Sequence, residues 1–140
     1  MLDPASRDPA SRDPANRHAD AACRTSVRVR DLPLLADIGI NPDEIGRRQP
    51  LVITVELELD QRPIGGIADT VDYRLIAAAA EDLAAVHIPL IETFAQELAR
   101  QCLAMSGVHR ARVAIDKPFA ITRGMAGVEI VMTNSQKDGR

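Results

Sequence analysis

The sequence predicts an α+β domain in which a four-stranded antiparallel sheet carries two helices on one face. Four segments alternate apolar and polar residues as half-buried strands do, and two segments between them have apolar residues at helical spacing. The order along the chain is strand, strand, helix, helix, strand, strand, or ββααββ. With 140 residues, 46% of them hydrophobic, the chain can bury one core, so we expect one domain.

The N-terminal region is a repeat that lacks large apolar side chains. Residues 3–17 are a five-residue unit in tandem, Asp-Pro-Ala-Ser-Arg twice and then Asp-Pro-Ala-Asn-Arg. Burial of such a segment cannot offset the entropy lost on ordering it. We expect a disordered extension at 1–24, a folded domain at 25–134 and a flexible tail at 135–140.

The first two strands are predicted on either side of a turn. The first begins near Thr25, where valines alternate with arginines, and residues 31–40 would continue it after a bulge at Pro33. Residues 51–59 have the clearest strand pattern, with five aliphatic side chains on one face and threonine and glutamates on the other. One buried and one solvated face is typical of an antiparallel sheet that is covered on a single side.

Two amphipathic helices follow, at about 73–86 and 90–105. Pro89 suits the start of the second helix and Gly107 suits its stop. The predicted apolar stripes are Leu75, Ile76, Ala79, Leu83 and Val86 in the first helix and Ile91, Phe94, Ala95, Leu98 and Cys102 in the second.

The last two strands are predicted at 110–116 and 126–133, where apolar and polar residues alternate again. A sheet of four strands has two edges, and neither edge strand is well protected by proline or by inward charge. Pairing between the edges of several copies would remove both edges. We therefore expect a homo-oligomer.

Composition argues against several classes of protein. The net charge is −3 and the basic residues are scattered, so the sequence lacks the basic patch that is typical of nucleic-acid binding. No apolar run approaches the ~20 residues that cross a bilayer, and no signal peptide is visible, so we expect a soluble cytoplasmic protein. The cysteines and histidines lie far apart without the spacing of metal ligands, which makes a zinc site unlikely and favours metal-free acid–base chemistry.

Two charged residues lie at the margin of the predicted core. Lys117 shares the parity of the buried residues of its strand, so it should emerge at the rim of the core, where partial loss of water favours proton transfer. Alternatively, the strand ends at Asp116 and the lysine reaches out to water. Glu92 lies in the first turn of the second helix, where the helix dipole favours a carboxylate whatever its function. In a pocket, it could accept two hydrogen bonds from the amidine-like edge of a pterin or guanine.

Two further residues have weaker support from the sequence. Tyr73, the single tyrosine, stands where an extended segment enters the first helix. It could pack against the sheet, or it could present a flat face and a proton-carrying hydroxyl to a heteroaromatic ring. Glu44 lies in the loop between the first two strands, and a glutamate in such a loop is most often solvated.

Four motifs together resemble the dihydroneopterin aldolase family. They are Ile38-Gly-Ile-Asn-Pro-Asp-Glu-Ile-Gly-Arg-Arg-Gln49, Asp69-Thr-Val-Asp-Tyr73, Leu90-Ile-Glu-Thr-Phe-Ala95, and Ile115-Asp-Lys-Pro118 with Gly127-Val-Glu-Ile130. The motifs occur in the family's order and cover about residues 26–133. The resemblance implies the tunnelling fold, in which subunits join edge to edge into rings, and an octamer or tetramer with its pocket at a subunit interface.

The resemblance also implies a reaction and a set of site residues. The reaction is retro-aldol cleavage of dihydroneopterin to hydroxymethyl-dihydropterin and glycolaldehyde, with no cofactor or metal. Lys117 would handle the proton of the side-chain hydroxyl through a water, Tyr73 would protonate the enol-like intermediate, and Glu44 would orient the lysine. Glu92 and backbone groups near Val71 and Ile91 would hold the pterin.

Two other functions stay open at the level of sequence. The dihydroneopterin triphosphate epimerase uses the same retro-aldol step, and Arg47 with Arg48 could serve a triphosphate, although Lys117-Pro118 favours the aldolase. A pterin- or purine-binding oligomer without catalysis would keep Glu92 and could dispense with Lys117.

Overall fold

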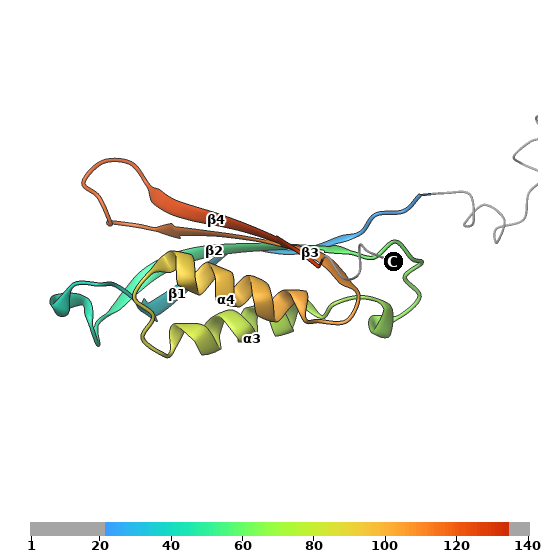
Figure 1. The fold of residues 1–140 in the computed structure, drawn as a ribbon, viewed down its shortest axis with the longest axis horizontal. Coiled ribbons are helices and arrows are strands. Elements are labelled where there is room, and N and C mark those ends of the chain that lie inside the picture. The colour runs from blue at the N-terminus through green and yellow to red at the C-terminus, as the bar shows by residue number, and fades with distance from the viewer. Residues whose placement is uncertain (1–21, 135–140) are drawn as a thin grey trace, which may run out of the picture.

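The computed structural model describes residues 22–134, which form one sheet with two helices on one face (Figure 1). The strands are β1 (Ser26–Asp37), β2 (Arg48–Leu59), β3 (Val108–Lys117) and β4 (Ala126–Thr133), and the helices are α3 (Tyr73–Ala84) and α4 (Ile91–Leu103). Two 3-10 turns, η2 (Pro42–Glu44) and η3 (Ile67–Asp69), follow β1 and β2. The predicted α+β class and the order ββααββ are confirmed. Most of the predicted extension at 1–24 and the predicted tail at 135–140 lie outside the described residues.

The sheet has the strand order β1-β2-β3-β4, and each strand is antiparallel to its neighbours. The alternation in β2 sets its faces as predicted, because the five aliphatic residues from Leu51 to Leu59 are buried. The register pairs Ile53 with Ile115 and Val55 with Val113, so the buried rows of β2 and β3 lie opposite one another. These rows form the layer on which the helices pack.

The bulge in β1 does not lie at Pro33, where the sequence predicted it. Pro33 pairs in register with Val52, and the register shifts between Val29 and Leu32 instead. Asp31 has a φ of 56° there, and its backbone N–H donates to the Thr54 hydroxyl at 3.1 Å. An aspartate tolerates this left-handed conformation better than most residues do, which explains why the extra residue is accommodated at this point.

Both helices pack on the sheet through small and aliphatic side chains. In α4 the predicted stripe is confirmed from Phe94 to Cys102, and Ala99 joins it. In α3 the predicted stripe is partly wrong, because Leu75 and Val86 are each 55% exposed. The buried residues of α3 are Ile76, Ala80, Leu83 and Ala84. The two alanines allow a closer approach of the helix to the sheet than larger side chains would.

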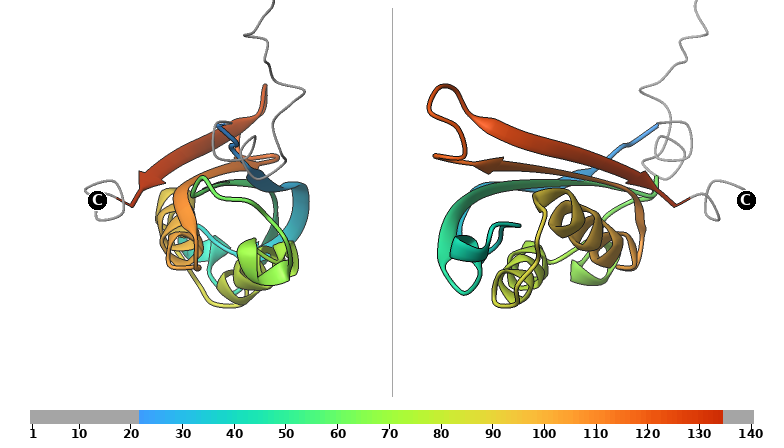
Figure 2. Two further views of the ribbon diagram at one scale, coloured as in Figure 1. Left: turned by 90° about the vertical axis from the view of Figure 1, so that its right-hand side faces the viewer. Right: turned by 60° about the vertical axis from the view of Figure 1, so that its left-hand side comes forward.

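The opposite face of the sheet carries no helix within residues 22–134, as two further views show (Figure 2). In the same part of the chain, β1 and β4 are the edge strands, and each pairs with one neighbour only. None of the helices between residues 22 and 134 has the length and apolar character needed to span a membrane.

Candidate functional site

Lys117 is the last residue of β3, and it follows the buried alternation of that strand. Ile115 is fully buried, and the Lys117 side chain is only 17% exposed at the end of the same row. Its Nζ donates a hydrogen bond of 3.2 Å to Oε2 of Glu44, whose side chain is 14% exposed. The strand therefore delivers an amino group to the rim of the core, where a carboxylate meets it.

Glu44 is held in place by several donors at the end of η2. The backbone N–H of Asn41 donates to Oε1 at 3.1 Å, and Nε2 of Gln49 donates to Oε2, also at 3.1 Å. The hydrogen bonds from Asn41, Gln49 and Lys117, in that order of size, lower the pKa of the Glu44 carboxyl from 4.5 to about 2. Glu44 is therefore a carboxylate at neutral pH, and its orientation is fixed by both the loop and β2.

Gly39 leaves the space that the Glu44 side chain fills. A Cβ at position 39 would lie 2.5 Å from Cδ and Oε1 of Glu44, well inside ordinary contact distance. The φ of Gly39 is also +131°, a conformation that side chains rarely adopt. Both the backbone and the packing therefore require glycine at this position.

The Glu44–Lys117 pair opens into a hollow of about 400 Å³. Its wall consists of the loop after β1, the entry to α4 and the ends of β3 and β4. Ile91 and Glu92, from the first turn of α4, line the hollow, and Glu92 is exposed there. A carboxylate at a helix start and an ammonium–carboxylate pair thus face one cavity. This arrangement can anchor an amidine-like edge and move a proton on the same small molecule.

Tyr73 and Val71 do not line this hollow within one chain. The first turn of α3 lies toward the opposite end of the sheet from the first turn of α4 (Figure 1). Val71 is buried in the core, whereas Tyr73 is 62% exposed. The structure therefore brings together four of the six predicted site residues, Lys117, Glu44, Glu92 and Ile91, and leaves two apart.

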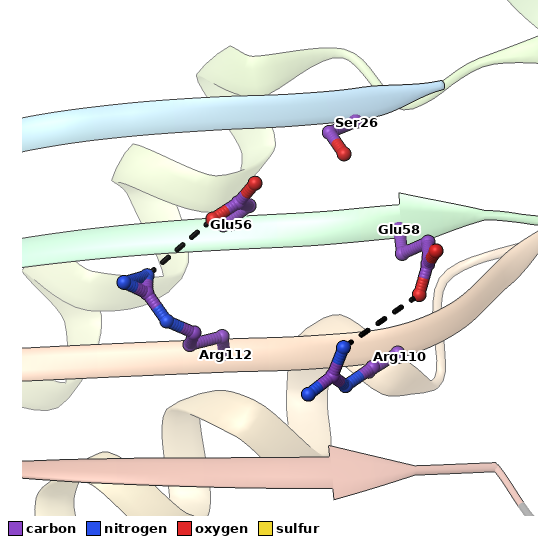
Figure 3. A pocket seen from close by; sticks show the side chains of 5 residues that line it. All are labelled: Ser26, Glu56, Glu58, Arg110 and Arg112. Carbon is purple, nitrogen blue, oxygen red and sulfur yellow. Dashed lines mark hydrogen bonds and ion pairs between the residues drawn. The ribbon is translucent and has the colours of Figure 1, made fainter. Parts of the chain in front are cut away.

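A second hollow, of about 340 Å³, lies on the open face of the sheet and is lined by Ser26, Glu56, Glu58, Arg110 and Arg112 (Figure 3). Its charges pair across strands, Arg112 with Glu56 at 3.4 Å and Arg110 with Glu58 at 4.0 Å. Cross-strand charge pairs of this kind stabilise strand pairing, and their arginine side chains are 38% and 50% exposed, whereas Lys117 is 17% exposed. We therefore place the chemistry in the first hollow.

Gln49 and Gly39 belong to the site, but no role was predicted for either residue from the sequence. Gln49 joins the site through β2, where its amide also donates to the Ile38 carbonyl at 2.7 Å. A glutamine at the start of a strand is not a signal by itself. The Glu44 side chain occupies the space beside Gly39 only because of the loop conformation, which no periodicity in the sequence predicts.

The described part of the chain contains no group of three histidine, cysteine, aspartate or glutamate side chains placed to hold a metal.

Known proteins of one family are similar to this chain. The family model described as FolB, dihydroneopterin aldolase, matches residues 27–133. Dihydroneopterin aldolase of Streptomyces coelicolor is 33% identical over 101 residues, which cover 67% of this chain and 82% of that protein. Dihydroneopterin aldolase of Methylorubrum extorquens is 34% identical over 117 residues, covering 78% and 90%. The crystal structure of the E. coli dihydroneopterin aldolase in complex with neopterin has a TM-score of 0.71 and 27% identity, covering 77% of this chain and 98% of that one.

Proposed function

The chain belongs to the dihydroneopterin aldolase family, and we propose that it is the aldehyde-lyase of folate biosynthesis that cleaves dihydroneopterin to hydroxymethyl-dihydropterin and glycolaldehyde. The observation that supports this function most directly is the Glu44–Lys117 pair at 3.2 Å, in the same hollow as Glu92. The solved relative in complex with neopterin shows that a member of this family binds a pterin.

The cleavage requires two proton transfers and a sink for electrons. The proton of the side-chain hydroxyl leaves, the adjacent carbon–carbon bond breaks, and glycolaldehyde departs. The electron pair enters the ring imine of the dihydropterin, and the carbon left behind then takes up a proton to become the hydroxymethyl group. Because the ring accepts the electrons, the reaction requires neither a Schiff base nor a metal.

We assign the first proton transfer to Lys117, acting through a water, with Glu44 fixing the position of its amino group. The carboxylate of Glu92 accepts hydrogen bonds from the amidine-like edge of the pterin, and the backbone near Ile91 adds to this binding. Catalysis and anchoring are thus divided between the end of β3 and the start of α4.

The second proton transfer is assigned to Tyr73 of another copy of the chain. Tyr73 is 62% exposed and lies away from the hollow of its own chain. Within residues 22–134, the outer edges of β1 and β4 pair with no other strand. Edge pairing of copies into a ring, as a tetramer or an octamer, would remove these edges. We propose that the same assembly supplies Tyr73 and the backbone near Val71 to a neighbour's site.

Product analysis tests the activity. The purified full chain, incubated with dihydroneopterin, should release hydroxymethyl-dihydropterin and glycolaldehyde, which chromatography identifies. Lys117→Ala should reduce turnover by at least about a hundredfold with modest loss of pterin binding, and Glu92→Ala should lose binding first. Arg112→Ala is a matched control, since Arg112 lies on the same strand and is also paired to a glutamate, at 3.4 Å. Near-normal turnover by Lys117→Ala would refute the assignment.

A complementation experiment tests the shared site. Lys117→Ala and Tyr73→Phe should each be inactive as pure assemblies. When the two variants are refolded together in equal amounts, about a quarter of the shared sites would contain both native residues and regain activity. No recovery of activity on mixing, in assemblies shown to contain both variants, would mean that Tyr73 does not act in a neighbour's site.

A second candidate function is epimerisation of dihydroneopterin triphosphate. Arg47 and Arg48 are exposed directly after the loop that holds Glu44, where they could bind a triphosphate. The same incubation with the triphosphate distinguishes the two reactions, because an epimer retains its side chain, whereas cleavage releases hydroxymethyl-dihydropterin. Absence of product from either substrate would favour a pterin-binding protein without catalysis.

We propose a cytoplasmic location, which cell fractionation would test.

A further inference from the structure

An aspartate and a histidine that the proposed reaction does not use are joined beside the candidate site. Asp37 is the last residue of β1, and His87 lies between α3 and α4. Nδ1 of His87 is 2.6 Å from Oδ1 of Asp37, and the two side chains are 27% and 21% exposed, respectively. The pair therefore joins segments that are 50 residues apart in the sequence.

The backbone on both sides of this pair is also joined. The N–H of Ile88 donates to the Asp37 carbonyl at 3.0 Å, and the N–H of Gly39 donates to the Pro89 carbonyl at 3.1 Å. Ile38 and Ile88 form a parallel bridge between these two bonds. The chain leading to Glu44 and the chain leading to Glu92 thus run side by side at this point.

Asp37 reaches a third segment as well. The same oxygen, Oδ1, accepts a hydrogen bond of 3.1 Å from the backbone N–H of Gly46, two residues after Glu44. The hydrogen bond from His87 is the largest influence that lowers the pKa of the Asp37 carboxyl, with smaller contributions from Gly46 and from the charge of Arg48. One ionised carboxylate thus connects β1, the loop that holds Glu44 and the entry to α4.

We propose that Asp37 and His87 are positioning residues, which form a clasp that fixes the Glu44–Lys117 pair relative to Glu92. The loop that carries Glu44 is closed at its start by the bond from Asn41 and at its end by the bond between Gly46 and Asp37. His87 holds that carboxylate against the segment from which α4 begins. Neither clasp residue lines the hollow, so they act through Glu44 and Glu92.

Loss of an ion pair with a purely structural role would have a different effect on turnover. Partly exposed pairs contribute little to stability, and their loss alters turnover only as far as the protein unfolds. A positioning pair alters turnover in the folded protein, because a displacement of about 1 Å in a catalytic group can reduce rates by up to a hundredfold. The proposal builds on the aldolase function for its kinetic test, but the position of the loop can be measured without any turnover.

The test compares His87→Leu, which removes the donor, with His87→Asn, whose side-chain amide can donate in place of Nδ1. His87→Leu should lower kcat about tenfold, and His87→Asn should stay within about threefold of the native protein. Hydrogen–deuterium exchange should increase in the peptide covering 38–47 for His87→Leu alone. Arg100→Leu is the matched control, since it breaks the exposed 2.8 Å pair with Glu97 on α4 and should change neither measurement.

A double variant shows whether the clasp acts through Glu44. In a Glu44→Ala background, His87→Leu should cause little further loss of kcat, because the group it positions is gone. The proposal is overturned if His87→Leu leaves both exchange and turnover unchanged, if His87→Asn is as impaired as His87→Leu, or if the two losses simply multiply. Absence of turnover in the native chain would instead refute the aldolase function, and the exchange measurement would still decide on the clasp.

Discussion

Replacement of Gly39 by alanine would place a methyl group in the space that the Glu44 side chain occupies. The new Cβ would lie 2.5 Å from Cδ and Oε1 of Glu44 and 2.6 Å from its Cβ. Carbon atoms prefer separations of about 3.5–4.0 Å, so relief of the overlap requires a movement of about 1 Å. The backbone of residue 39, with φ at +131°, cannot relax to suit an alanine without moving the loop.

The expected size of the effect has two parts. Holding a non-glycine residue at such a φ costs about 1–3 kcal/mol, and overpacking adds about 1–3 kcal/mol. We expect the free energy of unfolding to fall by about 2–6 kcal/mol, the sum of the two, which would lower the Tm by roughly 10 °C or more. The hydrogen bonds to Glu44 are already 3.1–3.2 Å long, so a shift of about 1 Å would break them and leave Lys117 without its fixed partner.

Chemical denaturation and product analysis on the same preparation measure both effects. Gly39→Ala should lose stability as above and lose at least about tenfold in kcat while still folded. Gly124→Ala is the control, because its φ is +80° but the nearest atom to an added Cβ is 3.9 Å away. It should lose about 1–2 kcal/mol from backbone strain alone and keep its turnover. Equal losses of stability in the two variants, or native turnover by Gly39→Ala, would refute the role given to Gly39.

The other predictions concern ionisation, thiol reactivity and packing. Because folding lowers the pKa of Glu44 from 4.5 to about 2, its ionised form stabilises the native state above pH 4.5, and this contribution disappears as the pH falls toward 2. Acid unfolding of Glu44→Gln should therefore depend less steeply on pH in that window than acid unfolding of the native protein. Burial raises the pKa of the Cys102 thiol to about 11, so at pH 8 a thiol reagent should label the exposed Cys23 and spare Cys102 until the protein unfolds, as mass spectrometry would show. Phe94→Ala should lower the free energy of unfolding by about 3–5 kcal/mol in chemical denaturation, since Phe94 is fully buried; a loss below about 1 kcal/mol would contradict its place in the core.

The sequence predicted the features that depend on local periodicity. Strand parity alone indicated that Lys117 follows the buried row of its strand, and β3 ends at that residue. The position of Glu92 in the first turn of a helix was likewise readable from the apolar stripe of α4. Both assignments need only the repeat of one element, with no knowledge of what lies across from it.

The features that periodicity could not predict depend on contacts between distant segments. Glu44 had weak support as a loop residue, yet Lys117, 73 residues away, donates to it. Ala80 and Ala84 give little hydrophobic signal, so the predicted stripe of α3 was rotated toward Leu75, which the structure exposes. A small side chain is buried because the sheet approaches it closely, and sequence spacing contains no measure of that distance.

Activity would depend on assembly if the site residues are divided between two neighbouring copies of the chain. A single chain already places the Glu92 carboxylate and a fixed ammonium–carboxylate pair around one hollow, because β3, α4 and the loop after β1 meet at one end of the sheet. Tyr73, at the start of α3, is 62% exposed and does not line this hollow. If a neighbour's Tyr73 delivers the last proton, a dissociated subunit retains part of its affinity for the pterin but cannot complete cleavage. Edge pairing would then be a requirement of the chemistry as well as a protection for β1 and β4.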